Sequence, residues 1–68
     1  MMAVRLKDIK KGEYFTLKPI EYPSDSQVYQ KDDYDRSEKK YLCIKCNDYL
    51  GTGRLLKGDK EVYVDFIY

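Results

Sequence analysis

The sequence contains no tryptophan and no histidine, and it has only two cysteines among its 68 residues. Without histidine, the serines Ser24, Ser26 and Ser37 lack the base that most often activates a hydroxyl nucleophile. A structural zinc site needs about four nitrogen or sulfur ligands, so one copy of this chain cannot complete one from two thiols. These absences argue against hydrolytic catalysis and against a zinc finger, and we expect no enzyme activity.

Long apolar runs are also missing, and no stretch approaches the length of a membrane span. The N-terminus reaches a charge at Arg5 and has no apolar core of the signal-peptide kind. We therefore expect a cytoplasmic protein with no membrane contact, in which both cysteines stay reduced.

The cysteines form a CxxC motif, Cys43-Ile44-Lys45-Cys46. A redox-active CxxC usually begins a helix, where the thiol pKa is lowered. Here the motif lies in a predicted strand, where residues three apart point to opposite faces. Two copies pooling four thiolates would be one route to a metal. The favoured interpretation is packing as small apolar side chains, with no metal and no cofactor.

Two other polar clusters suggest chemistry only weakly. Asp32, Asp33 and Asp35 carry oxygen ligands suited to Mg²⁺ or Ca²⁺, but adjacent carboxylates diverge on a strand. A solvated hairpin tip explains them better. The segment 51–54, Gly-Thr-Gly-Arg, lacks the lysine and serine of a phosphate-binding loop, although its amides and arginine suit an anion.

What the chain does have is tyrosine, eight in all, and a segmented charge. Residues 1–20 hold five basic and two acidic side chains, a net charge of +3. Residues 21–38 hold two basic and six acidic side chains (net −4), and residues 39–60 hold six and two (net +4). A total charge of only +1 therefore conceals a basic region and an acidic region.

The hydrophobic pattern predicts one small β domain spanning residues 1–68. A helical turn closed by glycine is expected at 6–12, followed by five strands at 13–18, 27–34, 39–46, 54–56 and 61–68. The fold class is mainly β, a small five-stranded antiparallel barrel or curled sheet of SH3-like or OB-like type. The strand at 39–46 has apolar residues on both faces, so we expect it in the middle of the sheet. The expected core residues are Val4, Leu6, Ile9, Phe15, Leu17, Val28, Leu42, Ile44, Leu55, Val62, Val64 and Phe66.

The alternation of side chains assigns the tyrosines to an outer surface. Phe15, Leu17, Val62, Val64 and Phe66 are expected to face inward, which places Tyr14 and Tyr63 outward.

Tyrosine rings on a sheet surrounded by lysine can stack on bases and follow a phosphate backbone. The candidate binding residues are Tyr29, Tyr41, Tyr63, Lys39, Lys40, Lys45 and Arg54, with Lys18, Lys31 and Lys57 nearby in the sequence. The leading hypothesis is a binding module for single-stranded nucleic acid. The alternatives are a protein-interaction or homo-oligomerisation module, since tyrosine is also enriched at protein interfaces, and a nucleotide or small-molecule binder.

Two resemblances accompany these patterns. Leu6-x-x-Ile9-x-x-Gly12-x-x-Phe15 is similar to the opening of many small SH3-like barrels. The segments Tyr-Asp-Arg-Ser at 34–37, Lys40-Tyr41-x-Cys43 and Leu-Lys-Gly-Asp at 56–59 resemble a group of short uncharacterised proteins of gut anaerobes and their phages or mobile elements. The second resemblance implies a separate cytosolic β protein, and it implies no catalytic residues.

Overall fold

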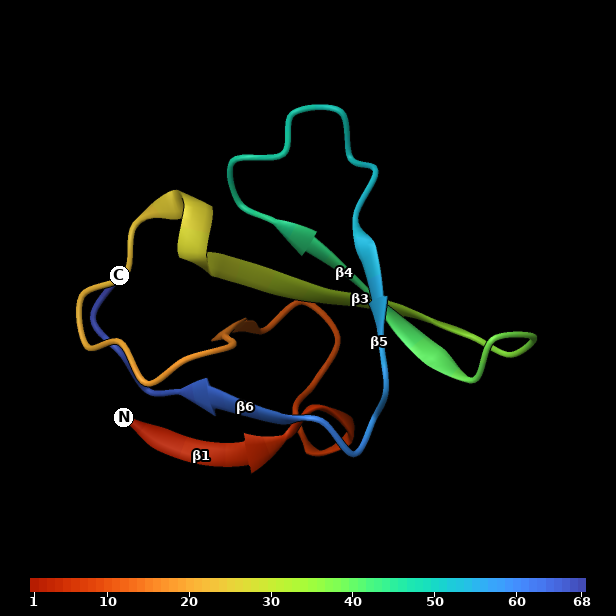
Figure 1. Cartoon of the computed structure of the whole chain (residues 1–68), viewed down its shortest axis with the longest axis horizontal. Coiled ribbons are helices and arrows are strands. Elements are labelled where there is room, and N and C mark those ends of the chain that lie inside the picture. Colours follow the sequence, from red (N-terminus) through yellow and green to blue (C-terminus); the bar gives the residue numbers. More distant parts are fainter.

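The computed structural model describes the whole chain, residues 1–68, as one antiparallel sheet of six strands that does not close into a barrel (Figure 1). Along the sheet the strand order is β1-β6-β2-β3-β4-β5. The strands are β1 (Met2–Arg5), β2 (Tyr14–Thr16), β3 (Val28–Asp35), β4 (Lys40–Lys45), β5 (Arg54–Leu56) and β6 (Glu61–Val64). Two short 3-10 turns, η1 (Leu6–Asp8) and η2 (Asp25–Gln27), complete the regular structure.

The mainly β architecture is confirmed, but the number of strands was wrong: the sheet has six strands, not five. The additional strand, β1, pairs antiparallel with β6 and places Met2 opposite Val64 and Val4 opposite Val62. Its four residues carry no strong local strand pattern. β1 exists because β6, on the other end of the chain, offers it an unpaired edge.

The last strand is also shorter than predicted, since β6 ends at Val64 rather than continuing to Tyr68. Asp65 has a φ of +64°, in the left-handed region, which turns the backbone out of the ladder. Phe66 is therefore half-buried beside the sheet and does not extend the inward row of β6.

The sheet curls strongly without closing. Only one residue pair, Thr16 and Tyr63, joins β2 to β6, while β3 and β4 share a long ladder interrupted by a bulge between Lys31 and Tyr34. A bulge bends the strand that carries it and increases its twist. As a result β1 and β6 lie at one side of the molecule and β3, β4 and β5 at the other (Figure 1). The strands β1 and β5 form the two free edges, so of the two predicted forms, a barrel or a curled sheet, the barrel is not formed.

The concave side of the curl holds the main core. Its buried members come from η1 and from five strands or their flanks: Leu6, Ile9, Phe15, Tyr29, Cys43, Leu56 and Val62. The prediction named Leu55 where the structure buries Leu56. The register explains this difference, because Leu56 lies opposite Tyr41 and Leu55 opposite Leu42 on the other face. Strand β4 has β3 on one side and β5 on the other, so it is an inner strand, although it lies next to a free edge and not in the middle of the sheet.

The buried side chain of Lys31 joins the N-terminal segment to β3. Its ammonium donates to the Ile9 carbonyl at 2.5 Å and lies 4.1 Å from the centre of the Tyr41 ring. Its backbone N–H donates to the Glu13 carbonyl, and its own carbonyl accepts from Gly12 at 2.7 Å. Gly12 has a φ of +93°, which confirms the expected glycine exit from the N-terminal turn. Lys31, which the sequence groups with the binding cations, is therefore a structural residue only 5% exposed.

The two helical turns span three residues each, and the structure has no helix long and apolar enough to cross a bilayer.

Replacing Lys31 by alanine should lower the free energy of unfolding by about 2 kcal/mol, because the Ile9 carbonyl loses a charged donor and the core loses the aliphatic stem. Urea unfolding followed by far-UV circular dichroism at pH 7 measures this loss. The matched control is Lys11→Ala, which removes a lysine whose ion pairs with Asp32 and Asp33 are exposed. The control should cost less than about 1 kcal/mol, and equal losses in the two variants would contradict the role of Lys31.

Because Lys31 is buried, we expect the free energy of unfolding to depend on pH. Burial lowers the pKa of Lys31 from its ordinary value of 10.5, so the unfolded chain binds more protons than the folded chain between the two pKa values. The stability contribution of Lys31 therefore rises with pH through that window, up to about pH 10.5. The difference in unfolding free energy between the natural protein and Lys31→Met should shift in favour of the natural protein between pH 7 and pH 10. A difference that is constant or moves the other way would contradict this.

Candidate functional site

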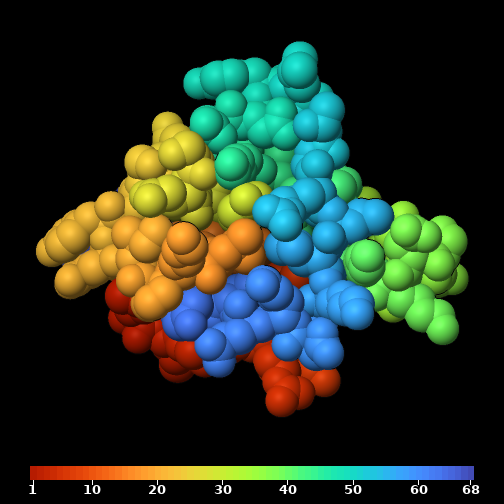
Figure 2. Space-filling view, viewed as in Figure 1, coloured from red at the N-terminus to blue at the C-terminus, as the bar shows by residue number.

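A groove lined by positive side chains crosses the concave face of the sheet. It consists of two hollows of about 170 and 320 Å³ that share Tyr29 and Lys45. Lys18 borders the larger hollow and Arg54 the smaller one, and Tyr29 and Cys43 form part of the lining. Figure 2 shows this face, with the segment after β2 in orange and the connection between β4 and β5 in teal above it. We call this surface the cationic groove.

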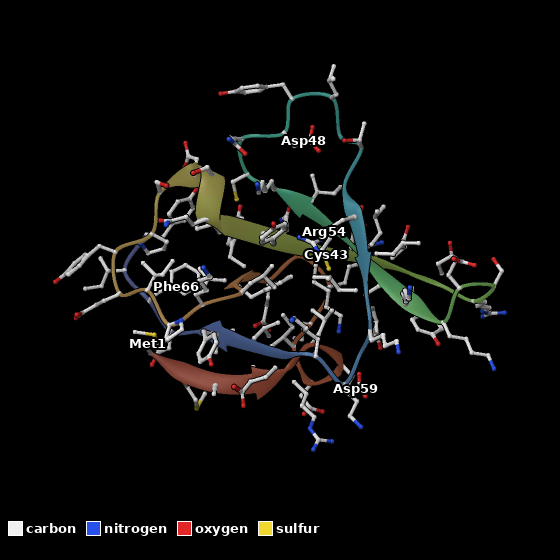
Figure 3. The ribbon with its side chains drawn as sticks, in the orientation of Figure 1. Met1, Cys43, Asp48, Arg54, Asp59 and Phe66 are labelled. Carbon is white, nitrogen blue, oxygen red and sulfur yellow. The ribbon has the colours of Figure 1, made fainter.

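Strand register places these residues together. Tyr29 lies opposite Lys45, and Cys43 lies opposite Arg54. Directly opposed residues share a face, as do residues two apart on one strand, so all four side chains project from the concave side. Figure 3 shows Cys43 and Arg54 close together near the centre of the molecule, with Asp48 in the loop above them.

Tyr29 is part of the core rather than an open platform. It is 7% exposed, and its ring stacks on Phe15 with centroids 5.7 Å apart and planes 18° apart. The ammonium of Lys45 lies 5.8 Å from the centre of the Tyr29 ring. One face of this ring is therefore occupied by Phe15, and the ring lies near the Lys45 ammonium instead of offering a free stacking surface.

Asp48 is the one carboxylate in the groove lining, and its oxygens are engaged by its own loop. They accept hydrogen bonds from the N–H groups of Leu50, Gly51 and Gly53 and from the Thr52 hydroxyl, at 3.0–3.1 Å. The Gly53 and Thr52 donors contribute most to lowering the pKa of Asp48. This network shapes the β4–β5 loop immediately before Arg54.

The groove cations have no anionic partners. Both ion pairs of the structure belong to Lys11, which contacts Asp32 and Asp33 at the outside of β3. Neither includes Lys18, Lys45 or Arg54. Three cationic groups thus surround an open groove with their charge available to an external anion.

Of the seven binding residues predicted from the sequence, the structure brings Tyr29, Lys45 and Arg54 together. Tyr41 lies further along β4, half-buried, with its ring 4.8 Å from that of Tyr34. Lys39 is the last residue of the turn before β4, and Lys40 is the first residue of β4. Both lie at the opposite end of that strand from Lys45.

Tyr63 lies on the other face of the sheet. It pairs with Thr16 and Ala3, and its hydroxyl donates to Glu61 at 2.9 Å. The expectation that Tyr29, Tyr41 and Tyr63 share one stacking platform was therefore wrong: one ring is packed in the core and another faces away. Tyr14 and Tyr63 lie on the face of the sheet opposite to their buried neighbours Phe15 and Val62, as the alternation of side chains predicted.

The seven residues predicted to bind did not include three others that bear on the groove. Lys18 follows β2 and lines the larger hollow, whereas Tyr22 and Tyr49 are outside the lining and belong to the loops that contribute Ile20 and Asp48 to it. These two tyrosines are 69% and 94% exposed. Their position in loops was a usable signal, because binding residues concentrate in loops held by a rigid scaffold.

The two cysteines are free and differ in environment. Cys43 is buried on the concave face, and Cys46 is half-exposed just after β4. Burial raises the pKa of the Cys43 thiol from 9.0 to about 11 despite the nearby charges of Lys31 and Arg54. This thiol is a packing element of the groove floor.

No family model matches the chain, and no curated protein and no solved structure matches it.

The cysteine environments predict unequal reactivity. In a Cys46→Ser variant, the remaining Cys43 should react with a disulfide reagent at pH 8 at least about 100-fold more slowly than in guanidinium chloride, because a pKa raised by about two units lowers the thiolate fraction by that factor. Absorbance of the released thiolate measures the rate.

The control is Cys43→Ala, whose half-exposed Cys46 should differ far less between the native and unfolded states. Equal native and unfolded rates for Cys43 would contradict its burial.

Proposed function

We propose that this protein is a non-enzymatic binding module for single-stranded nucleic acid, with the cationic groove as its binding site. The observation that supports this most strongly is the set of three cations, Lys18, Lys45 and Arg54, around an open groove without ion-pair partners. Unpaired lysine and arginine side chains along a groove are suited to successive phosphates. The guanidinium of Arg54 can meet two phosphate oxygens at once.

The bases need aromatic partners, and the exposed loop tyrosines Tyr22 and Tyr49 supply them. Stacking on an aromatic ring contributes about 1–3 kcal/mol per base and tolerates any base. The proposed role of Tyr29 is to position Lys45 at the groove rather than to stack. A strand of flexible nucleotides can enter a curved groove, whereas a net charge of +1 does not support tight binding of a duplex.

Self-association through the tyrosines is less well supported. That alternative requires the rings to be exposed in one copy and covered by another. Tyr29 is already packed against Phe15 within one chain, and Tyr41 is already in contact with Tyr34 and Lys31. A single nucleotide would use the same three cations, so it is included as a competitor in the test.

We further propose that the fold is an incompletely closed relative of the SH3-like barrels. The strands β2, β3, β4 and β5 form a meander, and β6 returns to pair with β2. The backbone N–H groups of Leu6 and Lys7 donate hydrogen bonds to the carbonyls of Lys60 and Gly58, so η1 lies against the turn between β5 and β6. An accessory role in a phage or mobile element agrees with the sequence resemblance.

Fluorescence anisotropy with a labelled 12-nucleotide single strand tests the binding. Affinity should fall with salt, with a slope of log K against log salt of about −2, from three phosphate contacts at about −0.7 each. The double variant K45A/R54A should reduce the slope to about −0.7 and weaken binding at low salt. Tyr49→Ala should weaken binding about five- to 150-fold without changing the slope.

The matched control is K39A/K40A, which removes the same charge from the other end of β4. It should bind nearly as well as the natural protein. Absence of any anisotropy change at low salt, or equal losses in the two double variants, would contradict the proposed function. A mononucleotide that competes at the same concentration as the oligonucleotide would instead identify a nucleotide site.

A further inference from the structure

Another hollow, separate from the two that form the cationic groove, has aromatic side chains in its lining. It has a volume of about 530 Å³ and is lined by Tyr14, Phe66, Tyr68, Val64, Gly12 and two carboxylate residues, Glu13 and Asp65. We call this surface the aromatic groove. Figure 3 places Phe66 at the side of the molecule where the two chain ends lie, away from Arg54.

The aromatic groove exists because β2 and β6 separate. Their only pair is Thr16 with Tyr63, and the left-handed turn at Asp65 carries the chain away before Tyr14 gains a partner on β6. The segments on either side of this divergence form the two walls. Tyr14 instead pairs with Gln30 on the face opposite to the cationic groove.

The rings are held at angles to one another. Tyr14 and Tyr68 have centroids 5.9 Å apart and planes 54° apart, and Phe66 and Tyr68 are 6.4 Å and 69° apart. Two contacts fix the C-terminal segment: the Tyr68 hydroxyl donates to Asp25, and the Ile67 N–H donates to the Glu21 carbonyl at 2.9 Å. The aromatic faces are thus arranged around the hollow before any ligand arrives.

The charge of this site is negative. Glu13 and Asp65 both line it, neither belongs to an ion pair, and no lysine or arginine is in the lining. One oxygen of Glu13 accepts the Lys10 N–H, and this neutral contact leaves the carboxylate charge in place. Aromatic faces attract cations through their quadrupole, and nearby carboxylates strengthen that attraction. The same carboxylates repel phosphate, so this surface is unsuited to the nucleic acid of the other groove.

We propose that the aromatic groove binds the ammonium group of a lysine side chain carried by a partner polypeptide. A polypeptide fits better than a free amine because the hollow is an open surface bordered by exposed apolar side chains. Met2 lies opposite Val64 on β1, and Ile67 lies between Phe66 and Tyr68, and both are more than half exposed. These side chains can cover the residues that flank the lysine.

Isothermal titration with three acetylated, amidated heptapeptides of otherwise identical sequence tests this site. The central residue is lysine, trimethyl-lysine or norleucine, which has a similar apolar chain without the charge. Both charged peptides should bind about three- to thirtyfold more tightly than the norleucine peptide. Equal affinity of all three would overturn the cation site in favour of a purely apolar groove, and absence of binding at millimolar peptide would overturn the proposal outright.

Two variants assign the effect to the aromatic groove. Phe66→Leu keeps the apolar bulk but removes a π face, and Asp65→Asn removes the charge while tolerating the left-handed backbone. Each should weaken the lysine peptide at least threefold and leave the norleucine peptide unchanged. The control Tyr49→Leu changes an exposed tyrosine at the β4–β5 loop and should leave the affinity for the lysine and norleucine peptides unchanged.

A competition arm separates the two sources of ammonium. Tetramethylammonium chloride should displace the lysine peptide only at concentrations far above the peptide's own, because it lacks the flanking apolar contacts. Displacement at equal concentration would overturn the polypeptide proposal and identify a free-amine site. Oligonucleotide binding by the Phe66→Leu variant should equal that of the natural protein, so the two grooves can succeed or fail independently.

Discussion

The attachment of the N-terminal segment to β3 through Lys31 is the constraint on which the rest of the fold depends. One residue supplies a backbone donor, a backbone acceptor and a buried ammonium to the segment between Ile9 and Glu13. Once that segment is fixed, Leu6 and Ile9 reach the core, and β1 is directed along β6. Burying a lysine opposes folding, and the Ile9 carbonyl and the Tyr41 ring offset part of that cost.

Both proposed binding surfaces arise from the sheet's failure to close. A chain of 68 residues can bury only a thin core and has little room for an enclosed cavity, so its hollows are open grooves on the surface. The cationic groove lies on the concave side near the free strand β5, and the aromatic groove lies where β2 and β6 part. The bulge in β3 and the left-handed turn at Asp65 are therefore features of the backbone that keep the sheet open.

The two grooves also have opposite charge. Lysine and arginine surround one, and glutamate and aspartate line the other. The two grooves share no lining residue, so the two proposed ligands would not compete for the same side chains. A net charge of +1 is the sum of these two regions and describes neither of them.

Local pattern by itself determined the β class, the glycine exit at Gly12, the fourth predicted strand at 54–56 and the inward direction of Phe15 and Val62. These features depend on a side-chain period of two and on backbone sterics, which neighbouring residues specify. Tertiary structure decided the pairing of β1 with β6, the end of β6 at Val64 and the burial of Lys31 and Tyr29. It also separated Lys45 and Arg54 from Lys39 and Lys40, although all four belong to one basic stretch of sequence. The reason is that strand pairing, register and bulges follow from contacts between residues far apart in the chain, and such contacts leave no signature in the local alternation.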